Sequence, residues 1–224
     1  LGGGTNIINV LASGDDISAA GVPLVAHVDT GNLVGTCGDD SITLTGLQLD
    51  HIIAGNGTID LGAGNNDTIN LKSTSAALNT LGATDGAIAG VEIVSAAAAT
   101  EAVTIDLHGQ SEAFTIVGGA HSDKLAGGSG NDTLTGGGGA DTFVFHANFG
   151  NDTITDFTAG VDFLQFDSDV FATAQDVLAH ISGGANAVIE DAAGNTVTLA
   201  GVDHASLTLA DIRIYDVVNH VIIS

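Results

Sequence analysis

The sequence predicts an all-β chain, built as a parallel β-roll or β-solenoid and followed by a small α+β cap. Three observations predict this fold. Nine-residue units follow one another without a gap over residues 118–144, and short β-branched stretches alternate with polar turns. Glycine accounts for 32 of the 224 residues, about twice its usual share. A fixed nine-residue period is typical of strands stacked in a β-helical array.

The units span 118–126, 127–135 and 136–144, and they repeat the same residue types at the same positions. Each begins with two glycines, carries Asp at position six and has a large apolar residue at position eight: Asp123, Asp132 and Asp141, then Leu125, Leu134 and Phe143. We expect six residues to form a turn, in which glycine permits positive φ, and three to form a strand. Two units then complete one coil, so each unit stacks on the next but one.

The repeated aspartates predict calcium sites. Turn carbonyls and one carboxylate per turn are hard oxygen ligands, which suit Ca²⁺ at a coordination number of six to eight. An ion between stacked turns draws on an Asp from each. Gly-Asp turns also occur in hairpins and in calcium-free solenoids. Carboxylates in register have no other evident use, however, so calcium is the preferred interpretation of residues 118–144.

These units resemble the RTX repeat family, secreted proteins of Gram-negative bacteria that are exported by type I machinery. The resemblance implies that each ion takes positions two, four and six of one turn and positions one, three and six of the turn two units later. A first site then comprises Gly119, His121, Asp123, Gly136, Gly138 and Asp141. Because His121 stands where the family prefers Gly, only its backbone carbonyl is expected to bind.

A fourth, imperfect turn at 147–155 supplies the second half of the next implied site. Two extra residues, Phe145 and His146, precede this turn and break the register. The implied ligands are Gly128, Gly130, Asp132, Ala147, Phe149 and Asp152. The segment 156–166 looks like the one that closes the roll in secreted RTX proteases. There Asp156 and Asp162 are implied to help bind a further ion, although either fits equally well as a solvated turn residue.

Composition agrees with a calcium protein. Asp and Glu number 27 against three Lys and Arg, for a formal net charge of −24. We expect the stacked carboxylates to repel one another until calcium binds, so that binding folds the roll. Extracellular modules bind with constants on the order of 10⁻⁴ to 10⁻³ M. The charge argues against nucleic acid and anionic membranes as partners, and no apolar run is long enough to predict a membrane span.

Residues 1–108 predict an irregular solenoid with degenerate repeats. The segments 35–43 and 62–70 place Asp40 and Asp67 at position six. These residues stand 27 positions apart, an odd number of units, so we expect them on opposite sides of the roll. Calcium binding there and plain solenoid turns capped by Asp both remain open. Strands are expected at Ile52-Ile53, 69–71, 91–94 and 103–107, and 109–117 is expected to be an ion-free coil that starts the stack.

The predicted roll occupies 109–167, and the C-terminal region 168–224 changes character. Thr173 is a candidate N-cap of a helix over 173–181, with Asp176 at the capping-box position. A hairpin is expected at 187–190 and 196–200, a short helix at 208–211, and a last strand at 217–218 and 221–223. This region looks like a type I secretion target domain. In several secreted proteases the chain ends with an acidic residue and a few apolar ones. Asp216, Val217 and Val218 match that pattern, but six more residues follow them, so the stretch that the exporter reads is left open. A simple cap that seals the roll is the alternative.

No catalytic constellation is visible: there is no His-Glu-x-x-His and no Gly-x-Ser-x-Gly, and the eight histidines show no zinc spacing. No N-terminal signal peptide is visible either, so we expect a C-terminal fragment of a larger protein. The sequence favours a non-enzymatic calcium module of a secreted or cell-surface, adhesin-like protein. The alternative is the non-catalytic domain of a secreted hydrolase or polysaccharide-modifying enzyme. Self-association and polysaccharide contact are left open.

Overall fold

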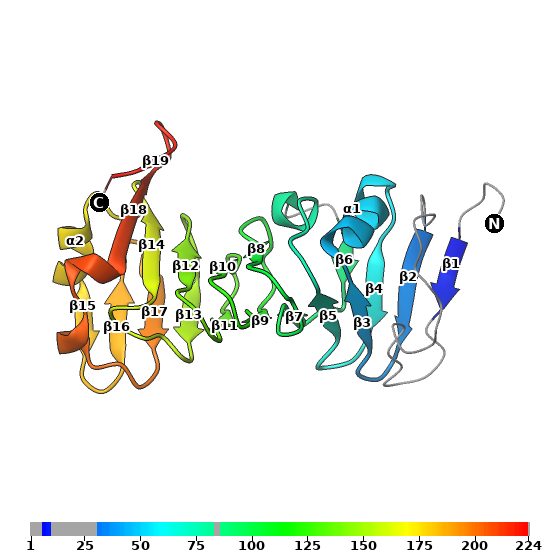
Figure 1. The fold of residues 1–224 in the computed structure, drawn as a ribbon, viewed down its shortest axis with the longest axis horizontal. Coiled ribbons are helices and arrows are strands. Elements are labelled where there is room, and N and C mark those ends of the chain that lie inside the picture. The colour runs from blue at the N-terminus through cyan, green and yellow to red at the C-terminus, as the bar shows by residue number, and fades with distance from the viewer. Residues whose placement is uncertain (1–5, 10–30, 83–85, 224) are drawn as a thin grey trace.

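The computed structural model describes residues 6–9, 31–82 and 86–223. Its strands stack side by side along one long axis, as Figure 1 shows. Three sheets make up the stack. The smallest has four parallel strands in the order β1 (Asn6–Asn9), β2 (Gly31–Thr36), β4 (Ile59–Gly62) and β6 (Ile88–Ala89).

The two larger sheets face each other across the roll. The six-stranded sheet runs β19 (Val221–Ile222), β18 (Ile212–Asp216), β14 (Phe163–Asp167), β12 (Thr142–Phe145), β10 (Lys124–Ala126), β8 (Thr104–Asp106). The nine-stranded sheet runs β15 (Ile181–Gly183), β16 (Ala187–Glu190), β17 (Thr196–Leu199), β13 (Asn151–Ile154), β11 (Thr133–Thr135), β9 (Thr115–Val117), β7 (Ile93–Ser95), β5 (Thr68–Leu71), β3 (Ser41–Leu44). Successive strands from β8 to β14 alternate between these sheets, which confirms the predicted parallel roll.

The strand register shows why the period is nine. Leu125 of β10 pairs with Phe143 of β12, and Leu134 of β11 pairs with Ile154 of β13. All four side chains are fully buried, so position eight of each unit forms the core as predicted. Each such burial contributes roughly 1.5–3 kcal/mol. Two units therefore make one coil, and the apolar residues form a continuous column between the sheets.

A helix replaces one expected strand. Ile52 and Ile53 belong to α1 (Gly46–Ala54), which begins at a capping box between Thr45 and Gln48. Leu49 and Ile52 are buried, so their three-residue spacing is that of the inner face of a helix. The strand prediction was wrong because two adjacent isoleucines favour a strand, whereas Thr45 and Gln48 already supplied a helix-start signal.

The unit at 109–117 does not start the stack. Its strand β9 lies in the middle of the nine-stranded sheet, between β7 and β11. Buried Phe114 stands in register with Asp132 of the following coil and with Glu92 of the preceding one, so this coil has no carboxylate at that position. That the coil is ion-free stays a prediction. The stack extends upstream because β3, β5 and β7 continue the same parallel pairing. The division into 1–108, 109–167 and 168–224 stays a prediction, although both larger sheets cross both boundaries.

The C-terminal elements follow the predicted order. Helix α2 (Ala174–Ala179) is capped by Thr173, and β16 and β17 form the expected hairpin. The helix ends before Ile181, which begins β15. Val217 and Val218 lie in a turn between β18 and β19 rather than in a strand, because Asp216 binds the turn's N–H groups. Short 3₁₀ helices complete the fold: η1 (Leu78–Thr80), η2 (His204–Ser206) and η3 (Leu209–Asp211).

The helices of the described residues are all short. None of those within 31–82 and 86–223 is long and apolar enough to cross a bilayer.

Candidate calcium-binding site

One ladder of aspartates lies at the start of the strands in the six-stranded sheet. Asp123, Asp141 and Asp162 directly precede β10, β12 and β14. The Asp123 N–H donates to Asp141 Oδ1 at 2.8 Å, and the Asp141 N–H donates to Asp162 Oδ1 at 2.9 Å. The second oxygen of Asp123 accepts from Gly119 N at 2.6 Å within its own turn. Each of the carboxylates of Asp141 and Asp162 therefore ties its own turn to the turn of the preceding coil.

The nine-stranded sheet carries a second ladder of the same design. The Asp132 N–H donates to Asp152 Oδ1 at 2.8 Å, and the Phe114 N–H donates to Asp132 Oδ1 at 2.7 Å. Asp132 Oδ2 accepts from Gly128 N, four residues earlier, as Asp123 does from Gly119. The sequence repeat thus becomes a spatial repeat on both sides of the roll.

These carboxylates are buried without a protein cation beside them. In the part of the chain that the structure describes, every ion pair joins a histidine to an aspartate outside both ladders. Burial and the neighbouring carboxylates of Asp162, Asp123 and Asp156 raise the pKa of Asp141 to about 6. Burial and Asp132 raise the pKa of Asp152 to about 8. Buried carboxylates that repel one another match the hard, divalent charge of Ca²⁺.

The two turns implied for the first site lie directly against each other. Gly138 N donates to the Gly119 carbonyl at 2.9 Å, and Thr142 N donates to the Asp123 carbonyl at 2.8 Å. Gly137 has a φ of +92°, and a Cβ there would overlap the Gly119 oxygen. The structure therefore brings both predicted halves, 119–123 and 136–141, together. A carbonyl that accepts one N–H keeps a second lone pair for a ligand.

The turns implied for the second site also stack. Asn151 N donates to Asn131 Oδ1 at 3.0 Å, and Gly150, at φ +84°, lies close above the Gly130 carbonyl. Of the two inserted residues, Phe145 extends β12 and is buried, while His146 follows the strand. Phe149 packs edge-on against Phe145, with ring centroids 5.2 Å apart. This packing keeps the imperfect turn in place despite the loss of its leading glycines.

Asp156 and Asp162, which come from the following coil, contact the second turn of the first site. Asp156 accepts from Gly136 N at 2.9 Å and from Gly137 N at 2.8 Å. Asp162 accepts from Asp141 N at 2.9 Å and from Thr158 N at 2.8 Å. Both carboxylates thus contact the turn at 136–141, so neither is merely solvated. Their part in a further ion site stays a prediction.

Comparison with known proteins identifies the nonapeptide repeats. The family model described as RTX calcium-binding nonapeptide repeat (4 copies) matches residues 117–154. The chain carries RTX calcium-binding repeats. No curated protein matches. Among solved structures, the chain is similar to the extracellular lipase LipA from Serratia marcescens, at 14% identity and a TM-score of 0.38. That match covers 84% of this chain and 40% of the lipase chain.

Upstream of the RTX repeats, Asp40 and Asp67 lie on the same side of the stack. The prediction of opposite sides was wrong, because one coil here takes 27 residues and includes α1 and β4. β3 and β5 are direct neighbours, and Asp67 Oδ1 accepts from Asp40 N at 2.5 Å. Asp67 N in turn donates to Glu92 Oε2 at 2.9 Å. Glu92 was missed because it lacks a surrounding Gly-Asp motif.

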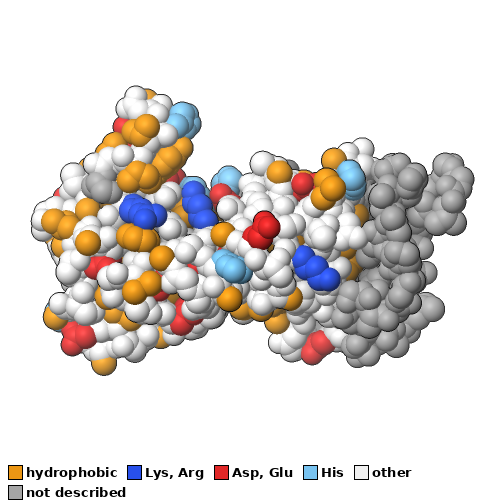
Figure 2. All heavy atoms as spheres, in the orientation of Figure 1, with side chains coloured by type: hydrophobic (Ala, Val, Ile, Leu, Met, Phe, Trp, Pro, Cys, Tyr) orange, Lys and Arg blue, Asp and Glu red, His pale blue; other side chains and the backbone are white. Residues whose placement is uncertain are grey.

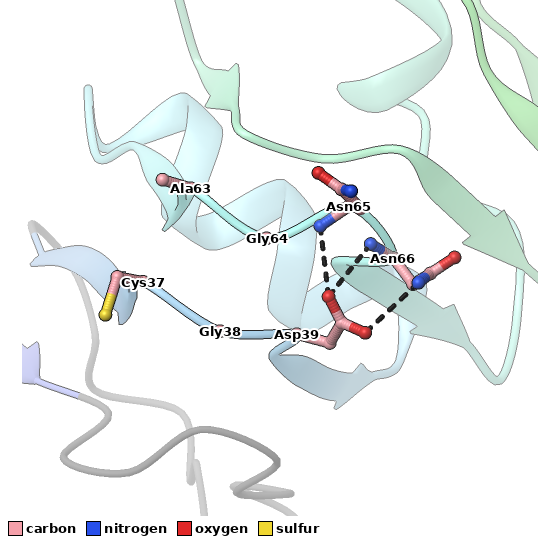
Figure 3. Close-up of a pocket in the computed structure, with 7 residues that line it drawn as sticks. All are labelled: Cys37, Gly38, Asp39, Ala63, Gly64, Asn65 and Asn66. Carbon is pink, nitrogen blue, oxygen red and sulfur yellow. Dashed lines mark hydrogen bonds between the residues drawn. The ribbon is translucent and has the colours of Figure 1, made fainter.

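A shallow polar pocket lies beside this upstream ladder, between the turns at 37–39 and 63–66 (Figure 3). There the exposed Asp39 carboxylate accepts from Asn65 N at 3.0 Å and from Asn66 N at 3.3 Å and Nδ2 at 3.1 Å. The backbone hydrogen bond from Asn65 and the bonds from Asn66 hold the pKa of Asp39 below its usual value. Asp39 thus joins two solenoid turns, and calcium binding at Asp40 and Asp67 stays open.

The sequence spacing of the histidines indicated no metal site, but the structure brings two of them together. His108 and His146 stand 38 positions apart, yet their rings lie 5.0 Å apart, centroid to centroid, beside Asp106. Sequence spacing missed this cluster because the coils of the roll, rather than a short motif, bring the residues together. This site lies at the other end of the strands from the RTX aspartates.

Proposed function

We propose that this chain is a calcium-gated folding module of a secreted or cell-surface protein, exported by type I machinery. The observation that carries the proposal is the pair of buried aspartate ladders, Asp123–Asp141–Asp162 and Asp132–Asp152. Among the described residues, none of the ion pairs involves these carboxylates. The matching family of repeats is described as calcium-binding, and Ca²⁺ would neutralise these carboxylates. Folding would then depend on the calcium concentration of the compartment.

Linkage explains how such a module couples export to folding. An ion that binds only the folded chain stabilises it by RT ln(1 + [Ca²⁺]/Kd). With a Kd on the order of 10⁻⁴ to 10⁻³ M, cytosolic calcium adds almost nothing, whereas millimolar calcium outside the cell stabilises the fold. The chain stays unfolded while it threads a narrow exporter and folds after release.

The C-terminal hairpin offers an accessible segment for the export machinery. Asp216, Val217 and Val218 form the turn between β18 and β19, and 80% of Val218 is exposed. Val221 to Ile223 are also exposed, and Figure 2 shows hydrophobic side chains gathered on the projection that these strands form. An acidic residue followed by exposed apolar ones is the pattern that the family resemblance implies for the secretion signal.

We further propose a structural, adhesin-like role for the chain itself rather than a catalytic one. The support is its architecture: a nine-stranded sheet continues along the stack from β3 to the antiparallel strands β17, β16 and β15. Such an array suits a stiff connector whose rigidity is set by calcium. Service as the non-catalytic domain of a secreted hydrolase or polysaccharide-modifying enzyme is the alternative, and a catalytic motif in an adjoining segment of the same polypeptide would favour it.

A calcium titration followed by far-UV circular dichroism tests the proposal, with Mg²⁺ as the ion control. We expect a cooperative gain of β signal with Ca²⁺ alone, shifted to higher calcium in Asp132→Ala and Asp141→Ala. Asp169→Ala is the matched control, because Asp169 is exposed and lies outside both ladders. A spectrum that is fully folded in chelator and indifferent to calcium would overturn the proposal.

A further inference from the structure

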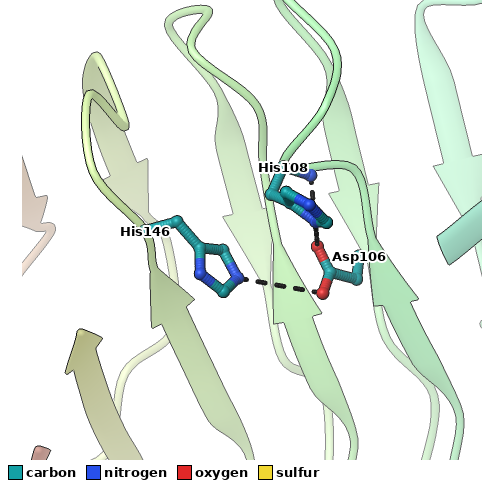
Figure 4. Close-up of side chains that lie close together, drawn as sticks. All are labelled: Asp106, His108 and His146. Carbon is teal, nitrogen blue, oxygen red and sulfur yellow. Dashed lines mark hydrogen bonds and ion pairs between the residues drawn. The ribbon is translucent and has the colours of Figure 1, made fainter. Parts of the chain in front are cut away.

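A cluster of two histidines and one aspartate lies on the outer face of the six-stranded sheet. The metal-ligating atoms of Asp106, His108 and His146 all lie within 4.8 Å of one another. His108 Nδ1 is 2.8 Å from Asp106 Oδ1, and His146 Nε2 is 3.8 Å from Asp106 Oδ2. Figure 4 shows the Asp106 carboxylate between the two imidazoles.

The roll itself creates this arrangement. Asp106 ends β8, and His146 directly follows β12, with β10 between the two strands. In the register across these strands, Asp106 pairs with Ala126, whose small side chain separates the two halves of the cluster. His146 is one of the two residues inserted into the nine-residue pattern. Because of this insertion, the His146 imidazole follows β12 at a point where a regular nine-residue repeat would already begin its next turn.

A fourth residue orients His146. Its Nδ1 lies 2.7 Å from Asp167 Oδ2, and Asp167, at the end of β14, is only 7% exposed. A carboxylate accepts hydrogen bonds, so Nδ1 carries a proton and donates it to Asp167. His146 Nε2 is then aimed towards Asp106, and it is buried without a hydrogen-bond partner of its own. Metal-ligating histidines are typically held in this way, by a carboxylate on the nitrogen opposite the metal.

We propose that Asp106, His108 and His146 bind one divalent transition-metal ion, and that Asp167 positions His146 for this role. Two imidazole nitrogens and one carboxylate oxygen form a donor set that suits Zn²⁺ and related ions, whereas Ca²⁺ takes oxygen ligands almost exclusively. Three protein ligands leave a coordination position for water or for a group from a partner. The site is separate from the aspartate ladders. Asp123, Asp141 and Asp162 lie at the start of their strands, whereas Asp106 ends β8 and His146 directly follows β12.

A proton competes with the metal at this site. Burial opposes the charged form of His146, but the carboxylates of Asp106 and Asp167 outweigh it and raise the pKa of His146 to about 9. The His146 imidazole, 3.8 Å away, and the hydrogen bonds from His108 overcome the effect of burial on Asp106 and lower its pKa to about 2. A bound metal takes the place of a proton on His146 Nε2, so metal binding at this site weakens as the pH falls.

Isothermal titration calorimetry with ZnCl₂ tests the proposal on tag-free protein in several millimolar CaCl₂, which keeps the RTX carboxylates saturated. We expect one Zn²⁺ per chain, and an affinity at least tenfold weaker in His108→Ala and His146→Ala. Asp167→Asn keeps all three ligands and is expected to weaken binding by about 10–100-fold, as loss of an orienting partner does. His204→Ala is the matched control, because His204 is also beside an aspartate, Asp203, at 3.4 Å but outside the cluster.

Folding is checked separately, by the calcium-dependent circular dichroism of each variant. His108 is about half exposed, so His108→Ala keeps the test decisive even if His146→Ala disturbs the roll. Zinc affinity that is unchanged in a folded His108→Ala variant would overturn the proposal. So would zinc binding that disappears as calcium is raised, because the zinc would then occupy the aspartate ladders.

Discussion

The backbone N–H of Asp123 donates to the carboxylate of Asp141 at 2.8 Å, although the two residues stand 18 positions apart in the sequence. The same bond recurs one coil later, from Asp141 to Asp162. Each aspartate therefore links two stacked turns by a hydrogen bond and also places a carboxylate in a buried position. The hydrogen bonds to these carboxylates stabilise the stacked turns, whereas repulsion among the carboxylates destabilises them. The stability of the roll therefore depends on the charge of the aspartates.

Protonation is the first such change, and it predicts opposite pH dependence with and without calcium. An aspartate whose pKa is higher in the folded chain than in the unfolded chain stabilises the fold below the unfolded pKa, and that contribution is lost as pH rises through the folded pKa. For Asp141 and Asp152 the folded values are about 6 and about 8, against 3.8. Without calcium, the free energy of unfolding should therefore fall between pH 5 and pH 8.

With calcium the sign reverses, because the ion binds carboxylates that have lost their protons. Urea unfolding at pH 5 and pH 8 measures both cases, in buffer stripped of calcium and in buffer with 5 mM CaCl₂, a concentration on the order of that outside cells. An unfolding midpoint that rises with pH in calcium-free buffer would contradict the buried-ladder account.

Removing one charge should separate stability from ion binding. Asp152→Asn keeps an oxygen that accepts from Asp132 N but abolishes the negative charge. At pH 9, where Asp152 is ionised in the wild type, we expect the variant to be more stable than the wild type without calcium and to bind calcium more weakly. Urea unfolding and calcium titration measure the two effects on one sample.

Asp169→Asn, at an exposed position outside the ladders, is the matched control and should change neither quantity. If Asp152→Asn destabilised the calcium-free chain as well, the carboxylate would act mainly through its hydrogen bond rather than through its charge.

The sequence predicted the roll because every unit from 118 to 144 obeys one local pattern, and position eight can pack only inward. The same reasoning failed for Asp40 and Asp67, which the structure places on neighbouring strands. Counting in nines assumes two short turns per coil, whereas the upstream coil contains α1. In an irregular coil the strands still stack in parallel, but the number of residues from one stacked strand to the next is not fixed.

The two kinds of candidate site differ for the same physical reason. The aspartate ladders were predictable, because each aspartate repeats within one unit and stacking only copies it. The cluster of Asp106, His108 and His146 has no repeat, and it depends on β8, β10 and β12 lying side by side. Only His146 carried a signal, since it is part of the insertion that breaks the register.

Core truncation should destabilise the calcium-bound roll strongly. Leu134 is fully buried and pairs with Ile116 and Ile154 on its two neighbouring strands. Leu134→Ala removes these contacts and leaves a cavity, so we expect a loss of about 2–5 kcal/mol in the free energy of unfolding. Thr135→Ala, one residue away, is the control. It removes only an exposed hydroxyl pair with Thr155 and should cost far less. Urea unfolding in saturating calcium measures both variants.

The turn glycines should differ sharply in how much substitution by alanine destabilises the roll, and the adjacent pair Gly138 and Gly139 tests this. Gly139 has a φ of +115°, and a Cβ there would lie 2.6 Å from the His121 carbonyl carbon. Gly138 has no positive φ, and its added Cβ would make an ordinary 3.6 Å contact with Ala120. Gly139→Ala should therefore destabilise the roll by about 1–3 kcal/mol, as backbone strain does, and shift folding to higher calcium. Gly138→Ala should leave both nearly unchanged. Since each variant keeps every carbonyl and carboxylate, equal effects would mean that the turn relaxes and that φ does not control the stacking.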